Sequence, residues 1–573
     1  MLRGTKLYVL FGLGTILWPL FSSARGESRI AFVHLFEWSW NDIGKECERQ
    51  LGPKGFTAVQ VSPPQQSVDR SEWWSRYQPI SYAIEGRGGS RSEFRAMVRR
   101  CASAGVDVYV DAVINHMAAL NRDFPLVPYT SNDFHTCRST INYSNRFEVQ
   151  NCDLVGLNDL KTESEYVRRK IADYMNDLID LGVKGFRLDA AKHMASGDIR
   201  AIVSKLKRRV FIFQEVIGAG GEAVQPSEYV SNGAVTEFKF ERTVGHFFKG
   251  RAKLKDIRHV INSRGWMRSD DAVVFVSNHD DQRQNTQATL TYKDIGNLYY
   301  IGEIFSLAYP YGYPKVMSSY FFEDHDQGPP RHGVHSGGAC GREWVCEHRW
   351  RGISNMVEFR GKTSGKFFVS HWWDNGNHQI GFGRGGLGYV MINREDFATI
   401  DKVVDTGMRQ GTYCDIVNGE VKDGLCDGAT ISVGADGKAH FKVGAIGAAA
   451  IHVGSLVRGG GGGNGGGDGS QSDDVEVSFE CRNGQTVTGQ GVYVVGSSVE
   501  VGVWEVGRAV QLSAAAYPTW RGTISMTRGQ RVEWKCIKRS EAKADNEQME
   551  QWQGGANNVL VASDDGQLAV ASF

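Results

Sequence analysis

Eight short apolar runs alternate with amphipathic segments between residue 29 and about residue 360, and this pattern constrains the fold more than any other feature. In chain order the runs are RIAFVHLF, AVQVSPP, VDVYVDAVIN, GFRLDA, VFIFQEV, AVTEFKF, AVVFVSNHD and YPKVMSSY. Continuous apolar runs are typical of strands buried on both faces of a parallel sheet. Eight such strands joined by helices predict a (β/α)8 barrel over residues 25–364. The alternative, a doubly wound open sheet, favours a glycine-rich turn after its first strand, where this chain has HLFEWSW.

Two segments between the runs are distinctive. One predicts a helix, because apolar residues recur every three or four positions at Val167, Ile171, Tyr174, Leu178 and Leu181. Thr162 and Glu165 have the spacing of a capping box at its start. The other, residues 115–159, is long and irregular, and it predicts a domain B inserted after the third strand.

Polar residues follow four of the predicted strands. They are Asp111, Asn115 and His116 after the third, Arg187, Asp189, Lys192 and His193 after the fourth, Glu215 after the fifth, and Asn278, His279 and Asp280 after the seventh. In a barrel of this kind the chemistry lies at the carboxyl ends of the strands. Arg187 and Asp189 share a strand face, so they either form a structural ion pair or face a functional cavity. Three acids that close apolar strands (Asp189, Glu215 and Asp280) favour the cavity.

Two carboxyl groups that face one bond are the apparatus of glycoside hydrolysis, in which one attacks the anomeric carbon and the other protonates the departing oxygen. A nucleophile must be ionised, and Arg187 is expected to lower the pKa of Asp189. An acid/base must hold its proton, which suits Glu215 after a wholly apolar strand.

The chain changes character after the barrel. Residues 365–457 contain short strands between Gly and Asn turns and predict an antiparallel β domain. Residues 458–474 are a glycine-rich linker. Residues 475–573 are again rich in strand-like runs, and a module on such a tether indicates a targeting domain, with a structural appendage as the alternative.

The first 24 residues have Arg3 and Lys6, an apolar run, and then small residues, as in a secretory signal peptide. A membrane anchor is the alternative, but Gly and Pro interrupt the run and no second apolar span follows. Export would make the ten cysteines candidates for five disulfides. Acidic and basic residues balance at 65 each, so nothing indicates nucleic acid or a membrane surface as a partner, and we expect a secreted monomer.

The stretches DAVINH, GFRLDAAKH, FQEV and FVSNHD resemble the four strand-end motifs of α-amylases, especially the animal-type, chloride-dependent branch. The likeness extends through ECERQLGPKGFTAVQVSPP, CDLVGLNDL and WVCEHRWRGISNMV, over about residues 29–455. It implies Asp189 as nucleophile, Glu215 as general acid/base, and Asp280 as the residue that orients substrate and stabilises the transition state. It also implies sugar contacts from Trp73, Trp74, Tyr77, His116, Arg187, Lys192 and His279. For Trp73 and Trp74 a stacking platform is favoured over a buried pair.

The same resemblance implies two ion sites. A calcium ion would be held by Asn115, Asp159, and backbone carbonyls of Gln150 and His193, and it would lock domain B onto the barrel. Chloride would be held by Arg187, Asn278 and Lys315. Many members have arginine where this chain has Lys315, so a weaker chloride site is expected, and Lys315 in the place of the anion is the alternative. The segment QRQNTQATLTYKD lacks the glycines of the mobile loop seen in related sequences, so loop closure is not inferred.

By family correspondence the disulfides pair Cys47 with Cys101, Cys137 with Cys152, Cys340 with Cys346, and Cys414 with Cys426, which leaves Cys481 and Cys536 for the last module. That module resembles the starch-binding module of amylases and glucoamylases through VYVVGSSVEVGVW, YPTWRG and VEWKCIKR. The likeness implies a first sugar site of Trp504, Lys535, Trp552 and Asn557, and a structural Trp520. Tyr517 matches a stacking residue of a second site, whose usual aromatic partner falls on Thr488.

The sequence therefore predicts a secreted, retaining, endo-acting α-amylase that cleaves α-1,4 links in starch, glycogen and maltooligosaccharides. An exo-acting, maltooligosaccharide-forming amylase or a transglycosylase on the same fold is the nearest alternative. A non-catalytic starch-binding protein is the alternative from another class, and the three acids argue against it.

Overall fold

The protein is described by a computed structural model. It covers residues 29–457 except 262, 285–287, 295, 336–339 and 341–342, and residues 474–573 except 488, 505, 507–508, 528–530, 541–548 and 564–566. The predicted signal peptide, the linker residues 458–473 and Thr488 lie outside the described residues. The chain forms two compact units, residues 1–460 and residues 461–573.

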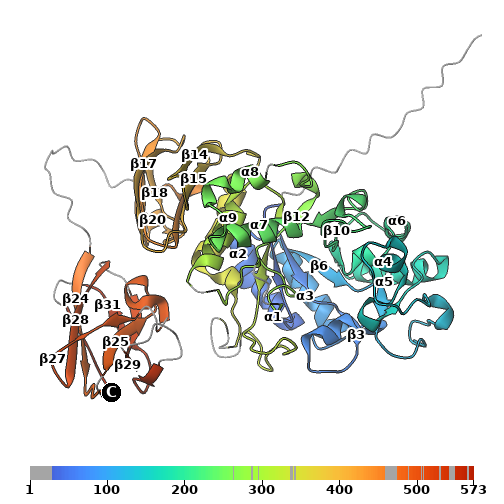
Figure 1. Ribbon diagram of the computed structural model, residues 1–573, viewed down its shortest axis with the longest axis horizontal. Coiled ribbons are helices and arrows are strands. Elements are labelled where there is room, and N and C mark those ends of the chain that lie inside the picture. The colour runs from blue at the N-terminus through green and yellow to red at the C-terminus, as the bar shows by residue number, and fades with distance from the viewer. Residues whose placement is uncertain are drawn as a thin grey trace, which may run out of the picture. The chain divides into compact units, whose positions relative to one another are not determined.

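The first unit contains a closed barrel of eight parallel strands, as the apolar runs predict (Figure 1). Around the barrel the order is β1-β13-β12-β11-β10-β9-β6-β2. The strands are β1 (Phe32–Leu35), β2 (Ala58–Val61), β6 (Asp107–Ala112), β9 (Gly185–Leu188), β10 (Phe211–Gln214), β11 (Ala234–Thr236), β12 (Ala272–Val274) and β13 (Tyr313–Ser318). The strands carry almost no exposed residue, because helices cover the outer face and side chains fill the inside.

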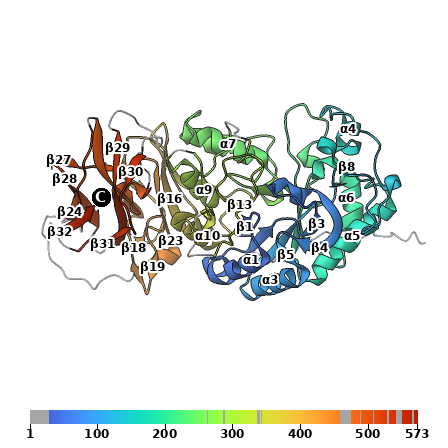
Figure 2. The same cartoon turned by 90° about the horizontal axis from the view of Figure 1, so that it is seen from below.

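Helices surround this barrel (Figure 2). They are α1 (Trp40–Glu46), α2 (Gly52–Lys54), α3 (Arg91–Ser103), α5 (Glu165–Asp180), α6 (Ser196–Val203), α7 (Phe238–Phe248), α8 (Ile257–Ile261), α9 (Leu298–Ala308) and α10 (Arg351–Lys362). The predicted capping box at α5 is wrong. The N-cap is Ser164, whose side chain makes no capping bond, and the Thr162 hydroxyl donates instead to Asp198 on α6 at 3.1 Å. A capping box does form at α3, between Ser90 and Glu93.

A layer of apolar side chains closes the barrel near the amino ends of its strands. Seven strands contribute to it, through Phe32, Ala58, Tyr109, Phe213, Ala234, Val273 and Tyr313. Polar side chains lie two positions further along four of the same strands, at His34, Gln60, Asp111 and Lys315, and Arg187 on β9 lies level with Asp111. The barrel is therefore sealed at one end and polar at the carboxyl end, where a site is expected.

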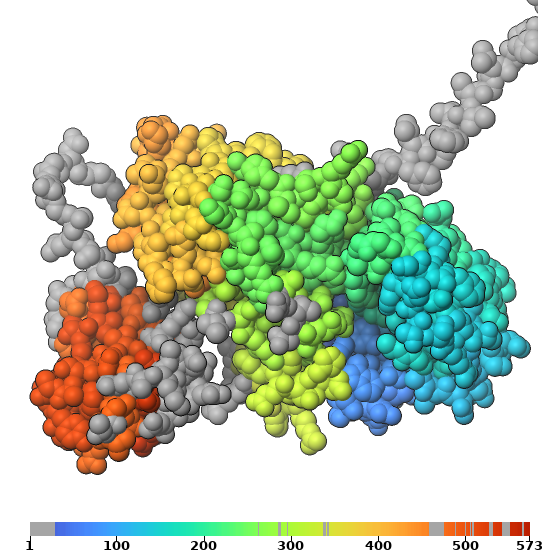
Figure 3. Space-filling model, viewed as in Figure 1, coloured from blue at the N-terminus to red at the C-terminus, as the bar shows by residue number. Residues whose placement is uncertain are grey.

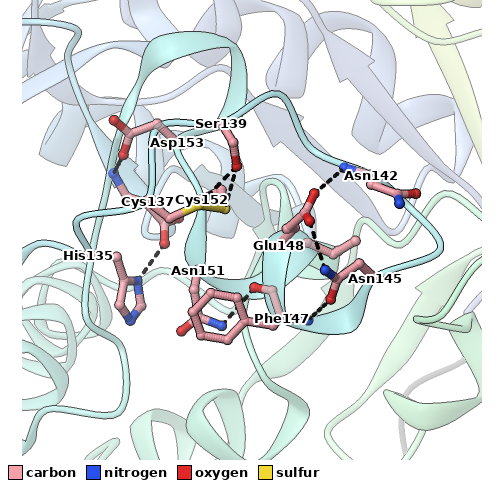
Figure 4. Close-up of a disulfide and its surroundings, with 12 residues drawn as sticks. His135, Cys137, Ser139, Asn142, Asn145, Phe147, Glu148, Asn151, Cys152 and Asp153 are labelled. Atoms are coloured by element: carbon pink, nitrogen blue, oxygen red, sulfur yellow. Dashed lines mark hydrogen bonds and ion pairs between the residues drawn. A yellow bond between two sulfur atoms is a disulfide. The ribbon is translucent and has the colours of Figure 1, made fainter.

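Domain B begins and ends in a two-stranded pairing of β7 (His116–Met117) with β8 (Asn158–Asp159). It contains α4 (Arg146–Asn151) and the Cys137–Cys152 disulfide, and it contributes to the cyan surface in Figure 3. Figure 4 shows how the disulfide region is ordered: the Glu148 carboxylate accepts from the Asn142 backbone N–H at 2.8 Å and from Asn145 Nδ2 at 2.7 Å. A second excursion, after β2, forms a small sheet of β3 (Gln65–Ser67), β4 (Pro79–Gly86) and β5 (Gly89–Ser90).

The predicted antiparallel β domain consists of two main sheets around their own core. One sheet has β14 (Ser370–Asp374), β15 (Gln379–Gly383), β16 (Gly388–Asn393) and β23 (Gly447–His452). The other has β17 (Ile400–Asp405), β22 (Lys438–Val443), β21 (Thr430–Val433) and β18 (Gly411–Cys414). A short pair, β19 (Val421–Lys422) and β20 (Leu425–Cys426), lies beside them in sequence.

The second unit is a sandwich of two sheets, which confirms the fold predicted for the last module. One sheet has β27 (Ser513–Ala516), β28 (Thr519–Thr527), β24 (Asp474–Arg482) and β32 (Gln567–Ser572). The other has β26 (Val510–Gln511), β25 (Gln490–Gly496), β29 (Arg531–Ser540), β30 (Met549–Trp552) and β31 (Asn558–Val561). Phe479 and Trp534 meet edge to face between the sheets, with ring centroids 4.8 Å apart.

All ten cysteines are paired: four disulfides are those that the resemblance implies, and the fifth joins the two remaining cysteines, Cys481 and Cys536. Among the described residues we find no helix with the length and apolar character needed to span a bilayer.

Candidate active site

Arg187 lies at the centre of the barrel mouth and contacts three carboxyl groups. Its Nη1 is 2.6 Å from Asp111 Oδ1 and 2.8 Å from Asp189 Oδ1, and its Nη2 is 2.7 Å from Glu215 Oε1. The guanidinium is almost wholly buried. Arg187 and Asp189 therefore form an ion pair, and this pair lies in the barrel mouth.

Strand register explains why these side chains meet. Arg187 on β9 pairs with Asp111 on β6, so both lie at one level of the barrel. Immediately beyond the strands, the Asp189 N–H donates to the Ala112 carbonyl at 3.1 Å, and the Glu215 N–H donates to the Leu188 carbonyl at 3.0 Å. These bonds extend the parallel ladder by one residue and fix both acids at the rim.

A tight turn after β9 brings Glu215 closer to its neighbours. Ala190 has φ +48°, a left-handed conformation that is unusual for a residue with a Cβ. In this conformation the Ala190 N–H donates to Glu215 Oε2 at 2.8 Å. The Glu215 carboxyl is thus held between a guanidinium and a backbone donor.

Asp280 completes the group of acids and is the most accessible of them. Its side chain is 34% exposed, against 11% for Asp189 and 12% for Glu215. Asn278 orders the turn, because its Oδ1 accepts from the N–H groups of Asp280 at 2.7 Å and Asp281 at 2.8 Å. His279 Nε2 lies 3.3 Å from Asp280 Oδ2.

The burial and close packing of the acids shift their pKa values. Burial raises the pKa of Asp189; Arg187 opposes this, and the charges of Glu215 and Asp111 add to it. Burial, and then the charge of Glu215, raise the pKa of Asp280 to about 7. Arg187 therefore acts on Asp189 in the expected direction, but burial and the neighbouring acids outweigh it. Together these carboxyl groups hold their protons more tightly than isolated carboxyl groups do.

The predicted sugar contacts lie around this centre. Tyr77 stacks on His279, with centroids 5.2 Å apart, and its hydroxyl donates to Asp111 Oδ2 at 3.0 Å. His116 Nε2 is 3.0 Å from the Tyr77 carbonyl. Lys192 Nζ donates to the Ile217 carbonyl at 2.7 Å and pairs with Glu222 at 2.6 Å.

Trp73 differs from the open platform that the resemblance implies. It is 7% exposed, and its indole N–H donates at 2.9 Å to the carbonyl of His325, in the loop after β13. The buried alternative therefore describes Trp73, while Trp74 is only partly buried. The sequence could not show this, because the covering loop is distant in the chain.

Arg283 belongs to the site, although the sequence analysis did not single it out. Its guanidinium carbon lies 4.2–5.2 Å from the ring centroids of four aromatic side chains, Phe36, Trp73, Tyr320 and Phe322. Its Nη1 donates to the His279 carbonyl at 3.0 Å. The sequence signal that could have indicated Arg283 is its charge, three positions after Asp280.

The residues implied for calcium are brought together where domain B meets the barrel. Asn115 Oδ1 and Asp159 Oδ1 are buried and accept no hydrogen bond from the part of the chain that the structure describes. His193 Nδ1 lies 2.8 Å from the carbonyl of Val149, the residue before Gln150. Within the same part, no three His, Cys, Asp or Glu side chains cluster as a metal site would need. Amide, carboxylate and carbonyl oxygens fit calcium, which prefers such ligands.

Removing calcium is expected to lower the thermal unfolding temperature, because the two uncompensated oxygens would lose their cation. A ligand present at 100 to 1,000 times its Kd contributes about 3–4 kcal/mol to stability. Unfolding followed by circular dichroism, before and after a calcium chelator, measures this. Added Ca²⁺ should restore the temperature and added Mg²⁺ should not; an unchanged temperature after chelation would contradict the site.

The residues implied for chloride lie beside the acids. Lys315 is buried, and we find no hydrogen bond or ion pair of its ammonium in the described ranges; Nζ lies over the Phe275 ring, 4.5 Å from the ring centroid. Burial, with the charge of Arg187, lowers the pKa of Lys315 to about 8. A buried ammonium without an acceptor fits an anion. Asn278 Nδ2 already donates one of its two hydrogens to Asp281 at 2.8 Å, so the other hydrogen is the one left to bind an anion.

In the last module the structure brings together two of the residues implied for the first sugar site. Trp504 and Trp552 lie with centroids 6.3 Å apart. Lys535 Nζ donates to the carbonyls of Gln553 and Gly555, and Asn557 Nδ2 donates to Glu533 at 3.2 Å. Tyr517 is 54% exposed. Trp520 is structural as expected, since it is buried and its indole donates to the Gly484 carbonyl at 2.7 Å.

Replacing Trp552 by alanine is expected to weaken adsorption to granular starch by about tenfold or more, as loss of an aromatic anchor does. The ratio of granular to soluble starch hydrolysis should fall with it. Depletion of protein from solution by washed granules measures the effect. Leu568→Ala, at a 54% exposed position on the opposite sheet, is the matched control. Equal adsorption by the two variants would remove Trp552 from the site.

The fold and the gathered carboxyl groups define a glycoside hydrolase with an attached carbohydrate-binding module. Residues 53–299 match the family described as "Alpha amylase, catalytic domain", residues 371–454 match "Alpha amylase, C-terminal all-beta domain", and residues 474–572 match "Starch binding domain". The chain belongs to the α-amylase family.

Its relatives include mammalian, insect and annelid enzymes. Pancreatic alpha-amylase 2a5 of Mus musculus is 45% identical, over 76% of this chain and 96% of the relative. Alpha-amylase of Tenebrio molitor is 44% identical, over 74% and 98%. The crystal structure of alpha-amylase I from Eisenia fetida is similar with a TM-score of 0.68 and 40% identity, over 74% and 97%.

Proposed function

We propose that this protein is a secreted, endo-acting α-amylase that hydrolyses α-1,4-glucosidic bonds of starch and glycogen with retention of configuration. The observation that carries the proposal is the single guanidinium of Arg187 that contacts both Asp189 and Glu215. Two carboxyl groups so held lie close enough to act on one bond from two directions. The names of the relatives, pancreatic and insect α-amylases, support the activity.

In the first step Asp189 attacks the anomeric carbon while Glu215 gives its proton to the departing glycosidic oxygen. The bond between the anomeric carbon and the leaving chain breaks, and a covalent glycosyl ester forms. In the second step the oxygen of a water molecule attacks the anomeric carbon and displaces Asp189. Glu215 takes the proton from this water and is thereby protonated again. Arg187 keeps Asp189 oriented, and Asp280 faces the positive charge that develops on the sugar.

Two ions complete the proposal. Calcium bound by Asn115, Asp159 and the carbonyls of Gln150 and His193 would hold domain B against the barrel. Chloride between Arg187, Asn278 and Lys315 would set the electrostatic potential at the acids. The rate after dialysis should rise as chloride is added back, and a flat response would remove the anion from the account.

The remaining features concern where the enzyme acts. Five disulfides and the predicted signal peptide 1–24 support an extracellular location. The starch-binding module would keep the enzyme on its substrate and raise the local concentration of glucan without adding contacts in the cleft. A monomer suffices for this chemistry, because all three acids come from one chain.

An endo-acting enzyme cuts long chains internally, so the viscosity of an amylose solution should fall well before many reducing ends appear. Parallel viscometry and reducing-sugar assays test this. An exo-acting enzyme would release short products while viscosity stays high, and a transglycosylase would make longer oligosaccharides from maltooligosaccharides; either result would overturn the proposal.

A further inference from the structure

Glu241 is a buried acid close to the catalytic residues whose role the mechanism does not explain. It lies on α7, has no exposed surface, and neither carboxyl oxygen has a hydrogen-bond donor among the described residues. Burying an ionised carboxylate without a partner is strongly unfavourable, so the group must either find a cation or keep its proton.

The neighbour of Glu241 is another acid. Its side chain meets that of Asp281, the residue directly after Asp280. Backbone packing brings these segments together: one turn further along α7, Gly245 lies against the carbonyl of Ala288 so closely that a Cβ would not fit. Two ionised carboxylates offer no donor to each other, but one protonated acid can donate to its ionised neighbour. A shared proton therefore accounts for both the missing donor and the contact.

The charged groups around Glu241 favour this arrangement. Burial, and then the charge of Asp281, raise the pKa of Glu241. Lys315 on β13 and Arg242 on the same helix act in the opposite direction but do not reverse it. The proton of the pair is therefore assigned to Glu241.

Asp281 transmits this arrangement to Asp280 through Asn278. Its Oδ2 accepts from Asn278 Nδ2 at 2.8 Å, which fixes which way the amide points. The Asn278 oxygen then faces the backbone N–H groups of Asp280 and Asp281, at 2.7 and 2.8 Å. If Asp281 turned away, the amide would lose its orienting partner and the turn that carries Asp280 would lose its anchor.

We propose that Glu241 is a positioning residue, which shares a proton with Asp281 and thereby fixes the Asn278 amide that holds Asp280 in the cleft. This inference rests on the proposed function for its kinetic readout, but not for the carboxyl pair itself. Above the pH at which the shared proton is lost, the two carboxylates repel each other and Asp280 is released. The rate should therefore fall on the alkaline side.

The pH profile of kcat separates positioning from mere packing. Glu241→Gln keeps a donor that does not titrate, so the alkaline limb should move to higher pH. Glu241→Ala removes the proton that Glu241 shares with Asp281, and kcat should fall by about tenfold or more, with a smaller change in KM. Glu303→Gln is the matched control, because Glu303 is equally buried on α9 but pairs with Tyr299 at 2.9 Å. Its alkaline limb should coincide with that of the wild type.

Thermal unfolding tests the pair without any activity. An acid with a raised pKa costs stability increasingly as pH rises from its ordinary value toward its raised one. Glu241→Gln should therefore gain in unfolding temperature over the wild type as pH rises from 4 to 8. If the alkaline limb of Glu241→Gln matches the wild type, the positioning role fails. If the unfolding temperatures of Glu241→Gln and the wild type change in parallel with pH, the shared proton is contradicted. If the wild type cleaves no starch, the proposed function fails and the thermal series alone decides the pair.

Discussion

Replacing Glu215 by glutamine is expected to abolish starch hydrolysis while binding to starch granules is kept. Glutamine has the same shape and can still face Arg187 and the Ala190 N–H, but it cannot transfer a proton. General acid–base catalysis contributes about 10²- to 10⁴-fold to a rate, so kcat should fall by at least that factor. Reducing-sugar release measures the rate, and depletion by granules measures binding.

Glu228→Gln is the control for this variant. Glu228 lies at the surface near the same barrel end and pairs with Arg146 at 2.7 Å. An exposed pair of this kind is worth little, so the rate should stay within about twofold of the wild type. Normal hydrolysis by Glu215→Gln would show that another group is the acid. Loss of granule binding would show that the substitution disturbs more than the reaction.

Replacing Arg187 by methionine is expected to remove activity and to destabilise the barrel. Three carboxyl groups would lose the cation that they share at 2.6–2.8 Å. Leaving buried charges without their partner costs about 3–5 kcal/mol. Denaturant unfolding measures the loss, and Arg268→Gln, at a position where the side chain is 82% exposed, is the control.

The loss should depend on pH in a definite direction. The pKa values of Asp111 and Asp189 are already raised by burial and would rise further without Arg187. For such groups stability is greatest below the ordinary pKa and is lost as pH rises through the folded value. The variant should therefore be closer to the wild type at pH 5 than at pH 8. An equal loss at both would mean that Arg187 acts by packing alone.

The barrel and the positions of the three acids could be predicted from the sequence because both depend on local patterns. A strand buried on both faces must be apolar throughout, and a parallel barrel places every strand end at one mouth. Asp189, Glu215 and Asp280 could therefore be recognised in the sequence as acids at the ends of apolar runs. Arg187 contacts Asp189 and Glu215. The register that places Arg187 on β9 beside Asp111 on β6 depends on the pairing of separate segments and could not be predicted from the sequence.

Other features depend on contacts between distant segments and had no local signal. Trp73 is covered because His325, more than two hundred residues later, accepts its indole hydrogen. Thr162 fits a capping box in sequence, but its hydroxyl finds Asp198 on another helix. Glu241 lies on the buried face of α7 with Phe238 and Val244, but the segment that this face packs against, which includes Ala288, is distant in the chain.

The central claim is that Asp189 and Glu215 act on the same glycosidic bond in two successive displacements. The most direct test is the anomeric configuration of the first product, followed by proton NMR as fresh enzyme cleaves a maltooligosaccharide, before mutarotation. The account predicts that the α-anomer of the new reducing end appears first and the β-anomer grows in later. Initial formation of the β-anomer would contradict it.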